Sequence, residues 1–183
     1  MTITVVPEQF QFVAFDSDLI RRVAERFVSA LRIDRPVHIE VDETTPLARV
    51  RLDLGDTITV RAESGAFEDT KRPRRQSETT TATSLGRVLL RAHDRLAGGF
   101  GDAPDEGTLS LAQVAAWDTY CAGRLERLGV SVNQQRWRYN FRNRHGFTDV
   151  GDAAFDRIWA SDALTWESLD DWSRRAGAPQ AMA

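Results

Sequence analysis

Cysteine and histidine are scarce in this sequence, and their scarcity excludes several kinds of chemistry. The 183 residues include one cysteine, Cys121, and three histidines. A single cysteine can form no internal disulfide and no cluster of thiolate metal ligands, so neither a disulfide framework nor a structural zinc site is expected. The histidines, His38, His93 and His145, lie far apart in the sequence. We therefore predict that the protein binds no metal and uses no cofactor.

Long apolar runs and an excess of basic charge are also missing. No run approaches the roughly 18 apolar residues of a membrane-spanning helix, and the first residues, MTITVVPEQF, lack the basic and then apolar pattern of a signal peptide. These absences predict a cytoplasmic protein with no membrane contact. The 24 basic residues against 27 acidic ones give a net charge of −3, whereas nucleic-acid binding depends on a basic face. We therefore expect a small molecule or a protein as the partner in preference to nucleic acid.

The first half of the chain alternates as β-strands do. Apolar residues occupy every second position in three segments, 37–41, 48–52 and 58–62, and this period is typical of a strand with one buried face. The links between them are short enough for hairpins. We therefore predict an antiparallel meander of three strands, or of four if the apolar run at 10–15 adds another.

Helical periodicity flanks these strands and resumes after them. Segments 17–31 and 78–97 carry apolar residues three and four positions apart, which is typical of a helix with one buried face. The predicted fold class is thus α+β, with these helices packed on one face of the sheet. Segment 64–76 lacks periodicity and contains Pro73, so we predict a long exposed loop there. The sequence at 110–113 is typical of a capping box that begins another helix.

A change in composition divides the chain into two halves. Segment 98–109 is rich in glycine, proline and aspartate, and we predict that it links an αβ half, 1–97, to a helical half, 110–176. Residues 177–183 are predicted to be a frayed tail. The length suits one well-filled core, so the two halves are expected to form a single domain over 1–183.

The order of helix, three strands, long loop and helix over 16–97 resembles the layout of the minimal zincin metalloproteases. In that family the second helix carries a His-Glu-x-x-His pair, in which both imidazoles bind one metal and the glutamate activates its water. This sequence departs from the motif, because His93 is followed by Asp94 and Ala97 stands where the second histidine would be. The resemblance covers less than half of the chain and implies no catalytic metal.

Arginine and aromatic residues are concentrated at 134–149, QQRWRYNFRNRHGFTD. Guanidinium groups bind phosphate and carboxylate through paired hydrogen bonds, and aromatic rings stack on planar ligands. The predicted loop at 64–76 adds a second group of arginines. Candidate ligand-binding residues from the two stretches are Trp137, Tyr139, Arg142, Arg144, Arg72, Arg74 and Arg75.

An internal role would also explain the first of these stretches. Residues 149–175 carry seven acidic side chains against three arginines, so the arginines before them could pair with these acids while the aromatic rings form core. We expect a division of roles, in which Arg136 and Arg138 are structural whereas Arg142, Arg144 and His145 face a ligand from a turn.

The leading functional hypothesis is a non-catalytic binding or regulatory protein that recognises an anionic small molecule or a protein partner through these residues. The alternative is a small enzyme acting on an anionic substrate, with His145 as the base, Asp149 or Glu68 as its carboxylate partner, and Arg142 and Arg144 as a clamp. A third hypothesis is a nucleic-acid-binding accessory factor, which would need a flat basic surface. The sequence specifies neither the ligand nor the oligomeric state.

Overall fold

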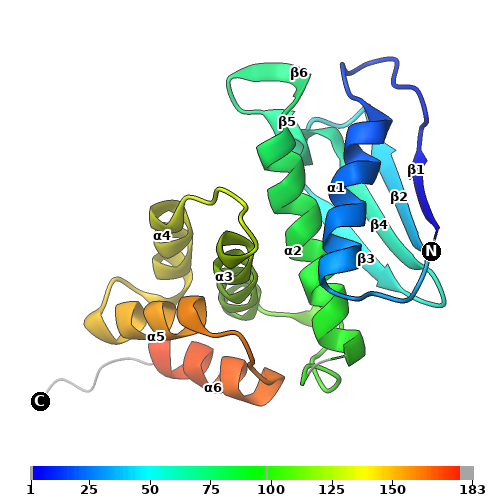
Figure 1. Cartoon of the computed structure of the whole chain (residues 1–183). Coiled ribbons are helices and arrows are strands. Elements are labelled where there is room, and N and C mark those ends of the chain that lie inside the picture. The colour runs from blue at the N-terminus through cyan, green and yellow to red at the C-terminus, as the bar shows by residue number, and fades with distance from the viewer. Residues whose placement is uncertain (1, 98, 178–183) are drawn as a thin grey trace, which may run out of the picture. The chain divides into compact units, whose positions relative to one another are not determined.

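Alternating apolar residues build a four-stranded sheet in the first part of the chain (Figure 1). The computed structural model describes residues 2–97 and 99–177, and the chain divides into two compact units, the first ending at His93 and the second beginning at Asp94. The sheet belongs to the first unit. Its strands are β1 (Ile3–Val6), β2 (Val37–Asp42), β3 (Val50–Leu54) and β4 (Ile58–Glu63).

The sheet is mixed, with the strand order β1-β2-β4-β3. Strands β1, β2 and β4 run parallel, so that Ile39 of β2 lies opposite Val5 on one side and Val60 on the other. Strand β3 pairs with β4 in the antiparallel direction, with Leu52 opposite Val60. The fold is therefore α+β with two parallel strand pairs and one antiparallel pair in this sheet.

The predicted antiparallel meander is wrong, because period two identifies a buried face but not the direction of a strand or its neighbour. The link after β2 covers 43–49 rather than a short hairpin, and it lets β3 pair on the far side of β4. The fourth strand is β1, whereas 10–15 forms no strand beyond an isolated bridge at Ala14. Helix α1 (Ser17–Ala30) is the crossover that makes β1 and β2 parallel.

The core of the first unit lies between one face of the sheet and two helices. Figure 1 shows α1 and α2 (Glu78–Ala97) on the same side of the sheet. Helix α1 begins at a cap, in which the Asp16 carboxylate accepts a hydrogen bond from the amide of Asp18 at 2.9 Å. Its apolar side chains recur at helical spacing and are buried: Ile20, Val23, Ala24, Phe27 and Val28.

Segment 64–76 is a short helical turn followed by a hairpin and is not the loop that its sequence predicts. It forms η1 (Ser64–Ala66), β5 (Glu68–Asp69) and β6 (Arg72–Gln76). The Asp69 carboxylate closes the turn by accepting hydrogen bonds from the Lys71 amide at 2.9 Å and from Arg72 Nε at 2.8 Å. Strand β6 is exposed up to its last residue, so no alternation of apolar and polar residues marks it in the sequence.

The second unit is built from helices. After the last turn of α2 it contains α3 (Leu111–Arg127), α4 (Gln134–His145), α5 (Asp149–Ala160) and α6 (Trp166–Gly177). The capping box predicted at 110–113 is confirmed, because Ser110 Oγ accepts from the Gln113 amide and Gln113 Oε1 accepts from the Ser110 amide. Helices α3 and α5 meet at Gly123, where a Cβ atom would lie 2.1 Å from the carbonyl oxygen of Trp159. Only glycine fits this contact.

A buried ion pair lies at the start of the second unit. Asp94, which is 3% exposed, accepts hydrogen bonds from both terminal nitrogens of Arg124, at 2.7 and 2.6 Å, and from Trp117 Nε1 at 2.8 Å. The Arg124 guanidinium also lies 3.8 Å from the centroid of the Tyr120 ring. The carboxylate is therefore fully engaged by α3, which compensates for its removal from water.

The division between the units falls inside α2, before the predicted linker at 98–109. The single domain over 1–183 stays a prediction. Of the predicted frayed tail at 177–183, Gly177 ends α6 and the rest lies outside the described residues. Over the two described ranges, no helix combines the length and the apolar character needed to cross a membrane.

We predict that the two faces of the sheet differ sharply in their contribution to stability. Ile39 is 0% exposed, so Ile39→Ala should lower the free energy of unfolding by about 2 to 5 kcal/mol through lost burial and the cavity left behind. Arg51 is exposed on β3, and Arg51→Ala should change the free energy of unfolding by about 0.5 kcal/mol or less. Urea unfolding of both variants measures the difference, and equal losses would contradict the assignment of the faces.

We also predict that Arg124→Met is strongly destabilising. The substitution removes the guanidinium that donates two hydrogen bonds to the buried Asp94 carboxylate, which should cost about 3 to 5 kcal/mol in the free energy of unfolding. A matched control is Arg175→Met, which breaks an ion pair to Asp171 on the surface of α6 and should cost less than about 1 kcal/mol. Similar urea midpoints for the two variants would show that the buried pair is not important for stability.

Candidate functional site

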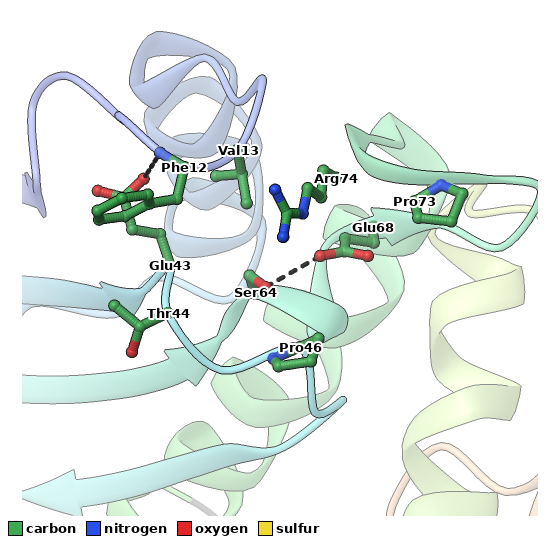
Figure 2. A pocket seen from close by; sticks show the side chains of 9 residues that line it. All are labelled: Phe12, Val13, Glu43, Thr44, Pro46, Ser64, Glu68, Pro73 and Arg74. Carbon is green, nitrogen blue, oxygen red and sulfur yellow. Dashed lines mark hydrogen bonds between the residues drawn. The ribbon is translucent and has the colours of Figure 1, made fainter.

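The carboxyl ends of the parallel strands open onto a hollow of about 310 Å³ in the first unit. In open sheets with parallel strands, ligands bind outside these ends, and small-molecule sites begin at roughly this volume. Three segments meet here, because the chain leaves β1, β2 and β4 at the same edge. The lining residues, drawn in Figure 2, are Phe12, Val13, Glu43, Thr44, Pro46, Ser64, Glu68, Pro73 and Arg74.

The floor of the hollow is the turn that follows β4. Ser64 is 1% exposed, and its hydroxyl lies 2.9 Å from Glu68 Oε1 and 3.2 Å from the carbonyl oxygen of Thr45, which are both acceptors. The turn packs against the link after β2 so tightly that a Cβ on Gly65 would lie 2.2 Å from the Pro46 carbonyl oxygen. The glycine therefore permits the close approach that holds Glu68 beside this link.

One wall is held by Glu43, the first residue after β2. Its Oε2 atom accepts hydrogen bonds from the backbone amides of Gln11 and Phe12, at 2.7 and 2.6 Å. This carboxylate ties the segment after β1 to the end of β2 and fixes Phe12 at the rim, as Figure 2 shows. The Phe12 side chain is nevertheless 58% exposed, so an aromatic ring is presented to solvent at the mouth of the hollow.

Arg74 supplies the cation of the hollow. Its backbone is in the left-handed region, with φ 62°, which costs a non-glycine residue about 1 to 2 kcal/mol. The conformation is held by the Ala14 amide, which donates to the Arg74 carbonyl oxygen at 2.8 Å. Figure 2 shows the guanidinium projecting into the hollow. Within residues 2–97 and 99–177 this guanidinium forms no hydrogen bond or ion pair.

The structure brings two of the predicted site residues, Glu68 and Arg74, into this hollow. Arg72 instead pairs with Asp69 at 2.8 Å in the turn of the hairpin. Arg75 is exposed and is not part of the lining.

The basic and aromatic stretch of the second unit is a helix, α4, rather than a ligand-facing turn. Arg142 Nε donates to Asp152 Oδ1 at 2.7 Å, and a second guanidinium nitrogen pairs with the other carboxylate oxygen. The hydrogen bond from Arg142 holds the pKa of the Asp152 carboxyl below its usual value. Arg138 pairs with Asp156 and lies 4.3 Å from the centroid of the Phe155 ring. Both arginines therefore join α4 to α5.

His145 is 4% exposed and is held on both sides of its ring. Nδ1 lies 3.1 Å from the Phe141 carbonyl oxygen, and Nε2 lies 2.8 Å from Ser173 Oγ. The carbonyl can only accept, so Nδ1 carries the proton and Nε2 accepts from the serine in the neutral ring. Burial lowers the pKa of His145, and the hydrogen bond to Phe141 opposes this shift. Asp149 is exposed in the first turn of α5, and His145 makes no hydrogen bond to it.

Two other predicted residues meet at a second hollow of about 310 Å³ on α3 and α4. Trp137 and Arg144 line it together with Asn140 and Asn143. Tyr139 lies elsewhere, with its ring 6.0 Å from that of Phe147. Trp137, Asn140 and Arg144 lie on one face of α4 because their positions follow helical spacing.

The sequence did not identify several residues of the first hollow, among them Phe12, Glu43, Thr44, Pro46 and Ser64. Each follows a parallel strand within a few residues. A meander places β3 between β2 and β4. The predicted sheet therefore kept the residues after β2 apart from those after β4, whereas the two parallel strands are neighbours and end at the same edge. The position of Glu43 directly after a predicted strand was the signal in the sequence, but it becomes useful only when β2 and β4 are known to be parallel.

No family model matches this chain, and no curated protein or solved structure shows significant similarity to it. The resemblance to the layout of the minimal zincins does not extend to a catalytic residue. Asp94 follows His93, where the motif of that family has glutamate, and its carboxylate accepts hydrogen bonds from Arg124 and Trp117. Among the described residues, no three histidine, cysteine, aspartate or glutamate side chains are grouped so as to hold a metal ion. The function must be inferred from the chemistry of the hollows themselves.

We predict that His145 makes the fold less stable at mildly acidic pH. Its folded-state pKa is lower than the unfolded value of 6.5, so the unfolded chain binds the proton more readily. The stability that the neutral ring contributes is present above about pH 6.5 and is lost as the pH falls through the folded-state pKa. Urea unfolding between about pH 7 and pH 5 should therefore show a steeper loss for the wild type than for His145→Gln. Parallel pH profiles would contradict the prediction.

Proposed function

We propose that the protein is a non-catalytic binding protein that takes a small anionic ligand in the hollow at the carboxyl ends of β1, β2 and β4. The observation that carries the proposal is the Arg74 guanidinium, which projects into the hollow and has no partner within the described ranges. A guanidinium binds carboxylate or phosphate through two parallel, charge-assisted hydrogen bonds. Arg74 is thus the group expected to bind the anionic part of the ligand.

Two further features support this assignment. The left-handed backbone of Arg74 is energetically unfavourable, and such conformations are concentrated at ligand sites because the surrounding structure stabilises them there. Phe12 is an exposed aromatic residue at the rim, and binding sites combine apolar and aromatic lining with a few polar groups. The volume of about 310 Å³ favours a small molecule or a single side chain of a protein partner.

Binding is favoured over catalysis because the polar groups of the hollow are poorly suited to acid/base chemistry. Ser64 is 1% exposed, so its hydroxyl oxygen is poorly accessible to a substrate atom that it would have to attack. No histidine lines the hollow. His145, the predicted base, has both ring nitrogens engaged by other groups.

The test is a thermal-shift titration of the full chain with phenyl phosphate and 3-phenylpropionate. A ligand selective for the folded state raises the melting temperature in proportion to the logarithm of its concentration above its Kd. We expect both probes to stabilise the wild type and Arg75→Gln but not Arg74→Gln. The control removes the neighbouring arginine of the same strand, whose side chain lies outside the lining.

Arg144→Gln extends the test to the second hollow. A shift that survives in Arg74→Gln and disappears in Arg144→Gln would contradict the proposal and assign anion binding to α3 and α4. The absence of a shift in the wild type with phenyl phosphate, 3-phenylpropionate and L-phenylalanine, which all carry an anionic group, would also contradict it.

A further inference from the structure

The proposed anion site has acidic walls, which restricts the kind of ligand that it can take. Arg74 shares the hollow with Glu43 and Glu68, so the lining carries two negative charges and one positive charge. A ligand with negative charge alone would gain from Arg74 but would be repelled by both carboxylates at short range. The charges of the hollow therefore call for a positive group in the ligand as well.

Each carboxylate retains an oxygen atom that could receive such a group. Glu43 uses Oε2 for both backbone amides, and Glu68 uses Oε1 for the Ser64 hydroxyl. Across the described parts of the chain, Glu43 Oε1 and Glu68 Oε2 accept no hydrogen bond. In Figure 2 the two carboxylates lie on opposite sides of the Arg74 guanidinium. An ammonium group has three donors and suits acceptors of this kind.

Most of the remaining lining is apolar. Phe12, Val13, Pro46 and Pro73 contribute carbon surface around the charged groups. An apolar side chain placed against the exposed Phe12 ring would remove both from water, and two aromatic rings would add a stacking contribution. The hollow thus offers a place for an anion, a cation and an apolar group within one small volume.

We propose that the ligand is a free α-amino acid with an apolar, preferably aromatic, side chain. Its carboxylate binds Arg74, its ammonium group binds Glu68, and its side chain packs on Phe12. This inference rests on the proposed function, since it assumes that Arg74 binds the anionic group.

The experiment compares three probes with the same aromatic skeleton by isothermal titration of the full chain. L-phenylalanine carries both charges, 3-phenylpropionate lacks the amine and phenethylamine lacks the carboxylate. We expect L-phenylalanine to bind with a Kd at least about tenfold lower than that of either other probe, because each of them leaves one charged wall unpaired.

Glu68→Gln provides the matched variant, because the amide oxygen still accepts from Ser64 while the charge is lost. We expect the affinity for L-phenylalanine to fall about tenfold toward that for 3-phenylpropionate, whose own affinity is retained or improved. The control is Glu78→Gln, which removes the same charge from an exposed position at the start of α2 and should leave the preference unchanged.

The outcomes separate this inference from the proposed function. If 3-phenylpropionate binds the wild type as tightly as L-phenylalanine and requires Arg74, the amino-acid inference is overturned and the anion site stands. If neither acid binds, or if Arg74→Gln has no effect on either, the proposed function fails. If Glu78→Gln lowers the affinity for L-phenylalanine as much as Glu68→Gln does, the loss reflects the net charge of the protein. This result would overturn the assignment of Glu68 as the residue that binds the ammonium group.

Discussion

The parallel pairing of β2 with β4 is the constraint on which the rest of the first unit depends. In this register Val37 lies opposite Ile58 and Asp42 lies opposite Glu63, so both strands end at the same edge. The next residues along each strand, Glu43 and Ser64, are thereby brought into one hollow. Because α1 makes β1 parallel as well, Phe12 reaches the same edge. A single choice of strand direction therefore assembles the site from distant segments.

Much of the first unit could be predicted from its sequence, but the missing part determined the topology. Alternation correctly identified the buried face, since Ile39 and Val60 are both fully buried. It could not give strand direction, because parallel and antiparallel strands with one buried face have the same period. Strand β6 was missed because it is exposed. Composition alone marked Arg74 and Glu68 as candidates, but their shared location required the three-dimensional structure.

In the second unit, helical spacing explains why the arginines of α4 are mainly structural. Arg138 and Arg142 are four residues apart, as are Asp152 and Asp156 on α5, so each pair occupies one face of its helix. The facing rows of opposite charge then pair along the contact between the helices. The acidic composition of the following segment predicted this pairing in general. Arg138 was expected to be structural, but Arg142 was expected to face a ligand, because its segment was predicted to be a turn and not the last part of a helix.

The position of Asp94 determines where the chain can be divided. The predicted linker at 98–109 is the obvious place to separate the halves, yet a cut there would leave Asp94 on the first fragment and Arg124 on the second. The helical fragment would then keep a guanidinium in a mostly buried position without its carboxylate, and the Asp94 carboxylate would be separated from Arg124 and Trp117. Fragments intended to preserve the helical unit should therefore begin before α2 ends, so that this acid stays with the helix that binds it.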